Sequence, residues 1–342
     1  MGEKVIVGMS GGVDSSVAAL LLLQKGFEVE GLSLILTPDD DGAAVRDARA
    51  VADKIGIPLH VEDKREEFKE KVIDYFVEEY KNGRTPNPCV VCNEHIKFGL
   101  MLSAARALGA GKLATGHYAK LQSDGDKVLL KMADSEKDQS YFLYRVSNEN
   151  FEHVMFPMAE FEKVDTRAIA KENGLPVAEK DDSQEICFIK DNDYVKFIKD
   201  YSNYTPKPGN FVNLQGEVIG QHAGIINFTV GQRKGLGMAF GEPMFVTKID
   251  AKTNDVILAP NGFQETKEFF VDNLKFQGEP IAEEKKLLVK IRYKAKPTLA
   301  TAIPIGDSIK VVFDEPQRAV TPGQSAVLYD GDIVVGGGFI RG

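Results

Sequence analysis

The feature that most constrains the fold is the run "VIVGMSGGVDSSVAALLLL", Val5 to Leu23, in which a short apolar segment passes through glycines into a long apolar segment. The first segment is typical of a buried strand, and the second is typical of a buried helix. Glycines let the backbone turn tightly between them, so that N–H groups and the helix start face one point. The run therefore predicts an anion-binding loop, lined by Gly8, Met9, Ser10, Gly11, Gly12, Val13, Asp14 and Ser15.

The loop belongs to neither of the two commonest nucleotide-binding types. The chain contains no Gly-Lys-[Ser/Thr], which excludes a Walker A loop, and the loop lacks the G-x-G-x-x-G spacing of dinucleotide sites. Asp14 is a candidate Mg²⁺ ligand, because carboxylate and phosphate oxygens suit a hard cation, but it could equally cap the helix that follows.

Strand and helix signals alternate over the first 200 or so residues of the chain. Alternation of this kind predicts an α/β fold, a doubly wound parallel sheet covered on both faces. A hairpin is expected in "KLQSDGDKVLLKMA", where an Asp-Gly turn joins two alternating segments. The expected helices are Ser15 to Lys25, Ala43 to Lys54, Arg65 to Tyr80, Asn93 to Leu108 and Asp165 to Pro176.

Helical periodicity largely stops at "NYTPKPGN", Asn203 to Asn210, and short β-rich runs separated by turn residues follow. A weaker break lies near Phe263 to Glu268. We therefore expect an α/β catalytic domain at 1–203, a small middle β domain at 204–265 and a C-terminal β barrel at 266–342.

Composition excludes several classes of protein. The longest apolar run, Val17 to Leu23, is too short to cross a bilayer, and no secretion signal is evident, so we expect a cytoplasmic protein without a membrane partner. Three cysteines in 342 residues argue against a disulfide framework. The net charge of -9 counts against general nucleic-acid binding, although "KKLLVKIRYKAK", Lys285 to Lys296, carries six basic residues and no acid.

"SGGVDS" resembles the pyrophosphate loop of the N-type ATP pyrophosphatases. Six further stretches resemble one family within that group, the tRNA-specific 2-thiouridylases: "GRTPNPCVVCNEHIKFG", "ATGHYA", "KDQSYFLYRV", "KDDSQEICFI", "FTVGQRKGLG" and "VTPGQSAVLYDGDIVVGGG". They occur in the family's order over nearly the whole chain. The resemblance implies that ATP and Mg²⁺ are used to adenylate the C2 oxygen of a wobble uridine, which sulfur then replaces.

The resemblance also implies roles for individual residues. Cys187 matches the persulfide-carrying position and Cys92 the nucleophile position, and the implied partners are tRNA with a wobble uridine and a sulfur donor. A helix is expected directly after Cys92, which would favour ionisation of its thiol. Leu34 and Gly116 join the loop at ATP-contacting positions, Asn87 and Pro88 face the target base, and the positions matching tRNA contacts are His117, Lys137, Asp138, Gln139, Arg292, Tyr293 and Gln324.

Cys89 departs from the family pattern, because many members carry Asp there, thought to act as an acid or base near the uridine. The change creates Cys89-Val90-Val91-Cys92, and Cys187 is the only other cysteine. We therefore expect the three thiols to converge and, as in the related cluster-dependent thiolases, to hold a [4Fe-4S] cluster. Two other readings remain open: a persulfide relay without a cluster, and zinc with His95 as a further ligand.

Two functions of other kinds are consistent with parts of the sequence. Another ligase of the same superfamily would share the loop but would have no evident use for three thiols. A non-catalytic tRNA-binding protein would keep the fold and bind tRNA without forming AMP.

Overall fold

The computed structural model describes residues 2–37, 42–125, 127–181, 186–263 and 265–342. Three features predicted from the sequence include residues outside these ranges: Asp126 beside the predicted Asp-Gly turn, residues 182–185 of "KDDSQEICFI", and Gln264 at the weaker domain break. The chain forms two compact units. Unit 1 comprises Met1–Val72, Cys89–Gln184 and Asp332–Val335, and unit 2 comprises Ile73–Pro88, Glu185–Gly331 and Gly336–Gly342.

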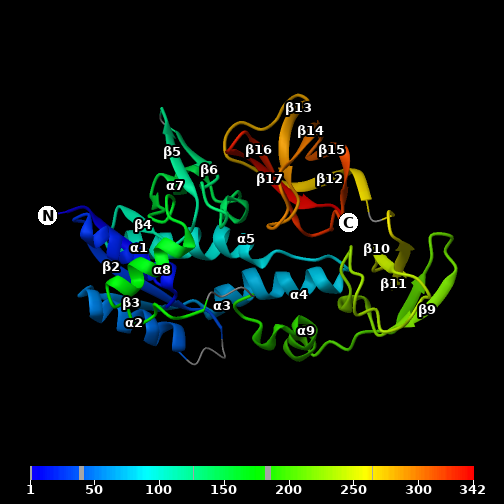
Figure 1. The fold of residues 1–342 in the computed structure, drawn as a ribbon, viewed down its shortest axis with the longest axis horizontal. Coiled ribbons are helices and arrows are strands. Elements are labelled where there is room, and N and C mark those ends of the chain that lie inside the picture. Colours follow the sequence, from blue (N-terminus) through cyan, green and yellow to red (C-terminus); the bar gives the residue numbers. More distant parts are fainter. Residues whose placement is uncertain (1, 38–41, 126, 182–185, 264) are drawn as a thin grey trace. The chain divides into compact units, whose positions relative to one another are not determined.

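Unit 1 is built on a parallel sheet of five strands in the order β3-β2-β1-β4-β7. Figure 1 labels β2, β3 and β4 of this sheet. The predicted parallel α/β fold is therefore confirmed. The strands are β1 (Lys4–Gly8), β2 (Glu28–Ile35), β3 (Leu59–Asp63), β4 (Lys112–Ala114) and β7 (Val154–Met155).

The two faces of the sheet are covered because side chains of β1 alternate. Val5 and Val7 are fully buried in one core cluster with α1 (Val13–Gln24) and α2 (Ala43–Ile55). Gly8 instead meets Met101, whose Sδ would lie 2.7 Å from a Cβ at this position. Met101 belongs to the helical run that carries Cys92, so this run covers the opposite face.

The other helices of this region follow the predicted periodicity, with differences at their ends. The predicted Arg65–Tyr80 helix is α3 (Arg65–Phe68), π-helical η1 (Lys69–Ile73) and α4 (Asp74–Lys81), and the predicted Asp165–Pro176 helix is α8 (Lys163–Glu172). Glu162 and Asp165 form a capping box at the start of α8, which moves its start two residues earlier than predicted. The remaining elements are the confirmed hairpin strands β5 (Lys120–Asp124) and β6 (Lys127–Lys131), with η3 (Ser140–Phe142) and α7 (Asn148–Phe151).

The first β-rich part of unit 2 is a four-stranded sheet in the order β10-β11-β8-β9. Its core holds buried aromatic and aliphatic side chains such as Phe211, Phe228 and Val246. The strands are β8 (Gly209–Val212), β9 (Val218–His222), β10 (Met244–Asp250) and β11 (Asp255–Pro260), and the helical elements of unit 2 outside α4 are η4 (Lys190–Asn192), α9 (Tyr194–Ser202) and η5 (Ile225–Asn227).

The last part of the chain closes into a six-stranded barrel, as predicted, because β12 pairs with both β15 and β17. Register shifts in β12 bend it from one partner to the other. Gly338 permits the close approach of β17, since a Cβ there would lie 2.3 Å from the Asp272 carbonyl oxygen. The strands are β12 (Glu265–Phe276), β13 (Lys285–Lys290), β14 (Thr298–Ile305), β15 (Ser308–Arg318), β16 (Ser325–Asp330) and β17 (Ile333–Ile340).

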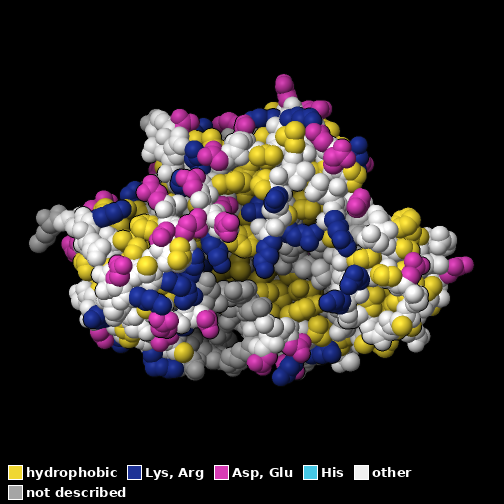
Figure 2. All heavy atoms as spheres, viewed as in Figure 1, with side chains coloured by type: hydrophobic (Ala, Val, Ile, Leu, Met, Phe, Trp, Pro, Cys, Tyr) yellow, Lys and Arg dark blue, Asp and Glu magenta, His cyan; other side chains and the backbone are white. Residues whose placement is uncertain are grey.

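The basic stretch Lys285 to Lys296 includes β13, and part of its charge is balanced. Lys285 pairs with Asp330, and Lys286 pairs with Asp314. Figure 2 shows acidic and basic side chains mixed over the barrel surface in view. Within the described ranges, none of the helices has the length and hydropathy that crossing a bilayer requires.

Candidate functional site

The glycine-rich loop runs from the end of β1 into α1, as the sequence predicted. Gly11 has a φ of 68°, and a Cβ there would lie 2.4 Å from the carbonyl oxygen of Ala44, so only glycine fits. Hydroxyl groups hold the turn: Ser15 Oγ donates to the Gly12 carbonyl at 3.2 Å and accepts from the Ser10 backbone N–H at 3.3 Å. The loop is thus a shaped backbone turn at the start of a buried helix, the geometry that binds phosphate groups.

Gly116 follows β4 and lies against this loop. A Cβ at Gly116 would lie 2.7 Å from the Ser15 nitrogen and 2.8 Å from the Asp14 carbonyl carbon. The structure therefore brings the predicted nucleotide residue Gly116 to the loop. Leu34, the other predicted nucleotide residue outside the loop, is half-buried near the end of β2.

Asp14 is tied to distant parts of unit 1. Its Oδ1 accepts hydrogen bonds from the Tyr118 hydroxyl and from Lys163 Nζ, each at 2.7 Å. The Tyr118 hydroxyl also lies 3.0 Å from Thr166 Oγ1 in α8. Gly12 occupies the N-cap position without a side-chain cap, so the capping alternative for Asp14 is wrong.

A second ammonium group, that of Lys180, borders the loop in addition to that of Lys163. It was not predicted from the sequence. Lys180 Nζ donates to the Gly11 carbonyl oxygen at 2.9 Å and to Asp47 Oδ2 at 2.6 Å. Lys163 and Lys180 lie far along the chain from the loop, and no local pattern marks either of them. Only the packed fold places two ammonium groups beside a turn that favours anions.

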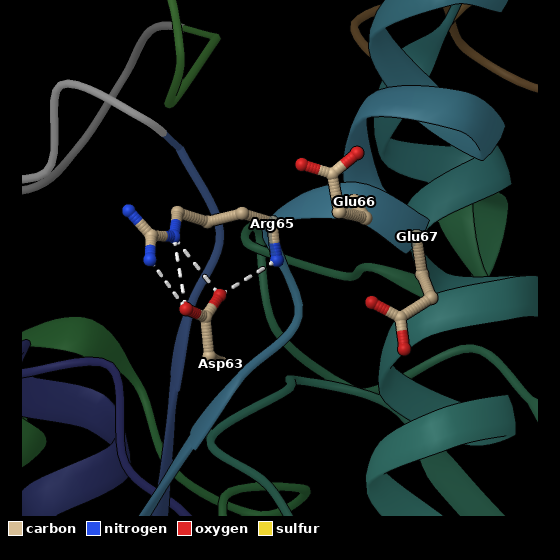
Figure 3. A pocket seen from close by; sticks show the side chains of 4 residues that line it. All are labelled: Asp63, Arg65, Glu66 and Glu67. Carbon is tan, nitrogen blue, oxygen red and sulfur yellow. Dashed lines mark hydrogen bonds and ion pairs between the residues drawn. The ribbon is translucent and has the colours of Figure 1, made fainter.

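A recess lies at the end of β3, where Asp63 closes the strand and Arg65 begins α3. Figure 3 shows the Asp63 carboxylate and the Arg65 guanidinium facing each other, with Arg65 Nε 2.9 Å from Asp63 Oδ1. The hydrogen bonds from Arg65 lower the pKa of Asp63 to about 2. Glu66 and Glu67 complete the lining, so this acidic recess does not favour phosphate groups.

The helix that carries Cys89 and Cys92 begins earlier than predicted. It runs through α5 (Pro88–Cys92), π-helical η2 (Asn93–Met101) and α6 (Leu102–Ala107). Cys92 therefore lies one turn inside the helix, and the expectation that it sits at a helix N-terminus is wrong. The reason is that Pro88 supplies a first helical residue that needs no N–H partner.

The two thiols of this helix differ in exposure. Cys92 is buried, whereas Cys89 is exposed. Burial by the surrounding protein nevertheless raises the pKa of the Cys89 thiol, and the Lys97 ammonium lowers it by less. The two observations agree because a side chain that water reaches on one side can lose hydration on its others.

His117 is buried beside Lys97, in unit 1. Lys97 Nζ lies 3.4 Å from His117 Nε2, and Thr115 Oγ1 lies 2.8 Å from His117 Nδ1. An ammonium group only donates, so Nε2 accepts and Nδ1 carries the proton that is donated to Thr115. Burial, and then the Lys97 charge, hold the pKa of His117 well below its usual range.

The helix that carries Cys89 and Cys92 is bound through side chains to the segment that follows β6. Asn93 Nδ2 donates to the Phe142 carbonyl at 3.0 Å, and Arg145 Nε donates to Glu94 Oε2 at 2.5 Å. Glu94 and Arg145 are largely buried, so each needs the other's charge. Sequence reasoning did not single out this pair, which is 51 residues apart.

The predicted tRNA residues of this segment, Lys137, Asp138 and Gln139, lie in one turn. Asp138 Oδ1 accepts from the Ala133 N–H at 2.9 Å, and Gln139 exchanges hydrogen bonds with the backbone of Tyr118. Lys137 is exposed. Asp138 and Gln139 thus shape the turn, and Lys137 presents a positive charge from it.

The other predicted site residues lie in unit 2. Arg292 donates to the carbonyl oxygens of Arg318 and Ala319 at 2.8 and 2.7 Å, while Tyr293 is half-buried with the Lys290 ammonium 5.4 Å from its ring centre. Asn87 and Pro88 are buried. Gln324 donates to the backbone just before them, and Cys187 is exposed.

The three cysteines are divided between the two units, with Cys89 and Cys92 in unit 1 and Cys187 in unit 2, so the predicted three-cysteine metal site stays a prediction. Across the residues that the structure describes, which include all three cysteines and His95, no three or more His, Cys, Asp and Glu side chains are grouped so as to hold a metal ion. Thiolates suit iron and zinc by their chemistry, so the three cysteines remain candidate metal ligands.

Comparisons with known proteins cover the chain from end to end. Residues 3–191 match the model described as tRNA methyl transferase HUP domain, residues 195–260 the tRNA methyl transferase PRC-barrel domain, and residues 266–340 the aminomethyltransferase beta-barrel domain. A protein of Clostridioides difficile (strain 630) named tRNA-specific 2-thiouridylase MnmA is 50% identical over 100% of this chain and 99% of its own length. Proteins of the same name from Acetivibrio thermocellus and Clostridium acetobutylicum are 49% and 48% identical, over 99% and 100% of this chain and 99% and 100% of their own.

Proposed function

The chain belongs to the tRNA-specific 2-thiouridylase family, and we propose that it uses ATP to replace the C2 oxygen of the wobble uridine of tRNA with sulfur. The observation that carries this conclusion is the identity of about half of all residues with 2-thiouridylases over the full length of the chain. Two matched domain models are described as methyl transferase domains. A methyl transfer reaction would not explain the presence of the glycine-rich loop, whereas ATP-dependent thiolation does.

In the activation step, the uridine C2 oxygen attacks the α-phosphorus of ATP and pyrophosphate leaves. We propose that the loop Gly8 to Ser15 holds the pyrophosphate, with Leu34 and Gly116 beside the nucleotide. Lys163 and Lys180 supply positive charge as the leaving group forms. Asp14 fits Mg²⁺ because it is the one carboxylate of the loop, and Mg²⁺ when bound supplies further charge neutralisation to the phosphates.

In the sulfur step, thiols of this chain handle the incoming atom. A persulfide on Cys187 adds its terminal sulfur to C2, and AMP leaves with the former C2 oxygen. The Cys92 thiolate then attacks the Cys187 sulfur, the S–S bond breaks toward the new thiocarbonyl, and a Cys92–Cys187 disulfide remains. A dithiol reductant restores both thiols, and a sulfane-sulfur donor reloads Cys187.

Cys89 occupies the position of the family's Asp and cannot replace its carboxylate charge. Because burial raises the pKa of its thiol, Cys89 is protonated at neutral pH, and its S–H can donate. We propose that it is a weak proton donor near the uridine. The second candidate is a [4Fe-4S] cluster held by Cys89, Cys92 and Cys187, which the Cys-x-x-Cys spacing favours.

The tRNA is the second substrate. We propose that Asn87 and Pro88 face the target uridine, and that contacts to tRNA come from His117, Lys137, Asp138, Gln139, Arg292, Tyr293 and Gln324. We further propose that residues 1–203 act as the catalytic domain, 204–265 as an adaptor and 266–342 as the tRNA-gripping barrel. We also propose that the protein works in the cytoplasm, where its substrates ATP and tRNA both occur.

The proposed function is tested by incubating the protein with unmodified tRNA, ATP, Mg²⁺ and a sulfur donor, and by measuring AMP and the nucleosides by mass spectrometry. We expect equal amounts of AMP and 2-thiouridine, both dependent on tRNA. Replacing Cys92 or Cys187 with Ser should abolish 2-thiouridine. If the wild type forms AMP without any thiolated nucleoside, and both Ser variants form AMP at the same rate, the result would favour another ligase of the superfamily. Binding of tRNA without AMP formation would favour a non-catalytic protein.

A further inference from the structure

Lys97 carries a positive charge that no described side chain balances. It lies half-buried in π-helical η2. Of the three N–H donors of its ammonium, one has an acceptor within the described residues, His117 Nε2 at 3.4 Å. No carboxylate in the described part of the chain forms an ion pair with Lys97. The charge and two of its donors are therefore available to a bound molecule.

The groups on which this charge acts are neutral. Burial keeps the pKa of His117 well below its usual range and raises the pKa of the Cys89 thiol, so neither group is charged at neutral pH. The rings of Phe98 and Phe156 lie 5.6 and 5.9 Å from the His117 ring, which makes the surroundings apolar. A cation is costly in such surroundings unless an opposite charge approaches it. The arrangement fits a site whose anion is supplied by a bound substrate.

Lys97 connects the helix that carries Cys92 to the neighbourhood of the glycine-rich loop, and all of these segments belong to unit 1. Because a π-helix bonds residue i to residue i+5, Lys97 lies one turn beyond Cys92. Its partner His117 directly follows Gly116, where a Cβ would lie 2.7 Å from the Ser15 nitrogen. The ammonium is thus held on the segment that packs against the loop, one residue away from the predicted nucleotide contact.

We propose that Lys97 is a catalytic residue that binds the α-phosphate of ATP and of the adenylated uridine. The inference rests on the proposed function, in which the loop holds the β- and γ-phosphates as the leaving pyrophosphate. The α-phosphate is the group that stays bonded to the base while sulfur approaches, so it lies between the loop and the incoming sulfur. Lys97 donates to its non-bridging oxygens, and its charge stabilises AMP as AMP leaves.

Lys97→Met removes the charge and keeps most of the length of the side chain. The measurement is the single-turnover rate of AMP formation at saturating ATP and tRNA, since saturation removes any effect of the substitution on affinity. We expect the rate to fall about 10- to 100-fold, as for the loss of a hydrogen bond to a charged group. Lys97→Arg, which keeps a cationic donor, should retain a larger part of the rate.

ATP with sulfur in place of one non-bridging oxygen of the α-phosphate reports the contact itself. This compound exists as two diastereomers, and the wild type should form AMP more slowly from the one whose sulfur faces Lys97, because sulfur is a weak acceptor. In Lys97→Met, the difference in rate between the diastereomers should shrink by at least about threefold. Lys163→Met, which removes a cation proposed to act on the leaving pyrophosphate, should slow both diastereomers equally.

Arg106→Met is the matched control on the same helical run. Arg106 lies in α6 and is exposed, so the substitution removes one positive charge that water already surrounds. The rate of AMP formation and the ratio between the diastereomers should keep their wild-type values in this variant.

A wild-type rate in Lys97→Met would overturn the inference, and so would a slow Lys97→Met with the diastereomer ratio of the wild type. A wild type that uses both diastereomers as fast as ATP would also overturn it. A loss seen only below saturating tRNA would make Lys97 a tRNA contact instead. If Lys97→Met does not fold, Lys97→Gln decides by the same two measurements. A wild type that forms no AMP in the presence of tRNA contradicts the proposed function itself, which is a separate outcome.

Discussion

The ammonium group of Lys163 lies 2.7 Å from Oδ1 of Asp14, the same carboxylate oxygen that accepts the Tyr118 hydroxyl. The single acid of the glycine-rich loop is therefore neutralised by a residue at the start of α8. Both described contacts fall on Oδ1. If Asp14 binds Mg²⁺ as proposed, Oδ2 would be the ligand and Lys163 would be available to the phosphates of ATP.

Lys163→Met should slow the formation of AMP. A hydrogen bond to a charged group contributes about 1.5–3 kcal/mol, so we expect kcat/KM for ATP to fall roughly 10- to 100-fold. Pyrophosphate release in the presence of tRNA measures this. Lys171→Met is the control, since Lys171 lies in the same helix and pairs with Glu179 in an exposed ion pair. Equal effects of the two substitutions would show that Lys163 has no specific part in ATP use.

Gly116→Ala should weaken nucleotide binding. The added methyl group would meet the backbone of Ser15 and Asp14 at 2.7 and 2.8 Å, and backbone at the start of a buried helix cannot move away cheaply. We expect the dissociation constant for a non-hydrolysable ATP analogue to rise about 5- to 150-fold, since clashes of this kind cost about 1–3 kcal/mol.

Gly111→Ala provides the comparison for Gly116. At Gly111 a Cβ would meet only the end of the Glu3 side chain at 3.4 Å, and the backbone there has no positive φ. ATP affinity should stay at the wild-type value in this variant. Wild-type affinity in Gly116→Ala as well would show that the loop does not have to keep its described shape to bind nucleotide.

The buried imidazole of His117 should make the free energy of unfolding depend on pH. Its pKa is held well below the ordinary value of about 6.5 by burial, so at pH values below that value the unfolded chain takes up a proton that the folded chain does not. Stability therefore falls as the pH is lowered below about 6.5, by up to about 1.4 kcal/mol per pH unit, and this contribution is constant above it.

Urea unfolding of the wild type and of His117→Gln between pH 5 and pH 8 measures the free energy of unfolding of each protein. The largest change expected in the difference between them is about 1.4 kcal/mol per pH unit. The stability advantage of the wild type should shrink as the pH falls, because Gln does not titrate. A difference between the two proteins that is independent of pH would mean that His117 is protonated in the folded state as readily as in the unfolded state.

Iron analysis separates the two routes for sulfur. The persulfide route predicts negligible iron and acid-labile sulfide in anaerobically purified and reconstituted protein. After the protein is incubated with a sulfane-sulfur donor, mass spectrometry should then find a persulfide on Cys187. About four iron atoms and four sulfides per chain, lost on replacing any one cysteine with Ala, would contradict this and establish the cluster.

The parts of the fold that depend on local pattern could be predicted. The strand–loop–helix unit at Val5 to Leu23, the parallel sheet and the closing barrel follow from hydrophobic periodicity and turn residues, which are properties of neighbouring positions. The residues at which helices begin and end were harder to predict. The helix carrying Cys89 begins at Pro88 instead of the predicted Asn93, although Asn87-Pro88 has the residue types of a helix start.

Contacts between distant segments could not be predicted. Tyr118, Lys163 and Lys180 reach the loop only through the folding of unit 1, and each is an ordinary residue in its own stretch of sequence. The three-cysteine site is a prediction of the same kind, because the spacing of Cys89 and Cys92 says nothing about where Cys187, 95 residues further along the chain, lies.

The most direct test of the central claim follows the oxygen that leaves the base. An anticodon stem-loop with a heavy oxygen isotope at C2 of the wobble uridine is incubated with the protein, ATP, Mg²⁺ and a sulfur donor, and the AMP and nucleosides are weighed by mass spectrometry. Adenylation of the C2 oxygen predicts that every AMP formed with 2-thiouridine carries the label on its phosphate. Unlabelled AMP, or label retained in the uridine while AMP accumulates, would contradict the account.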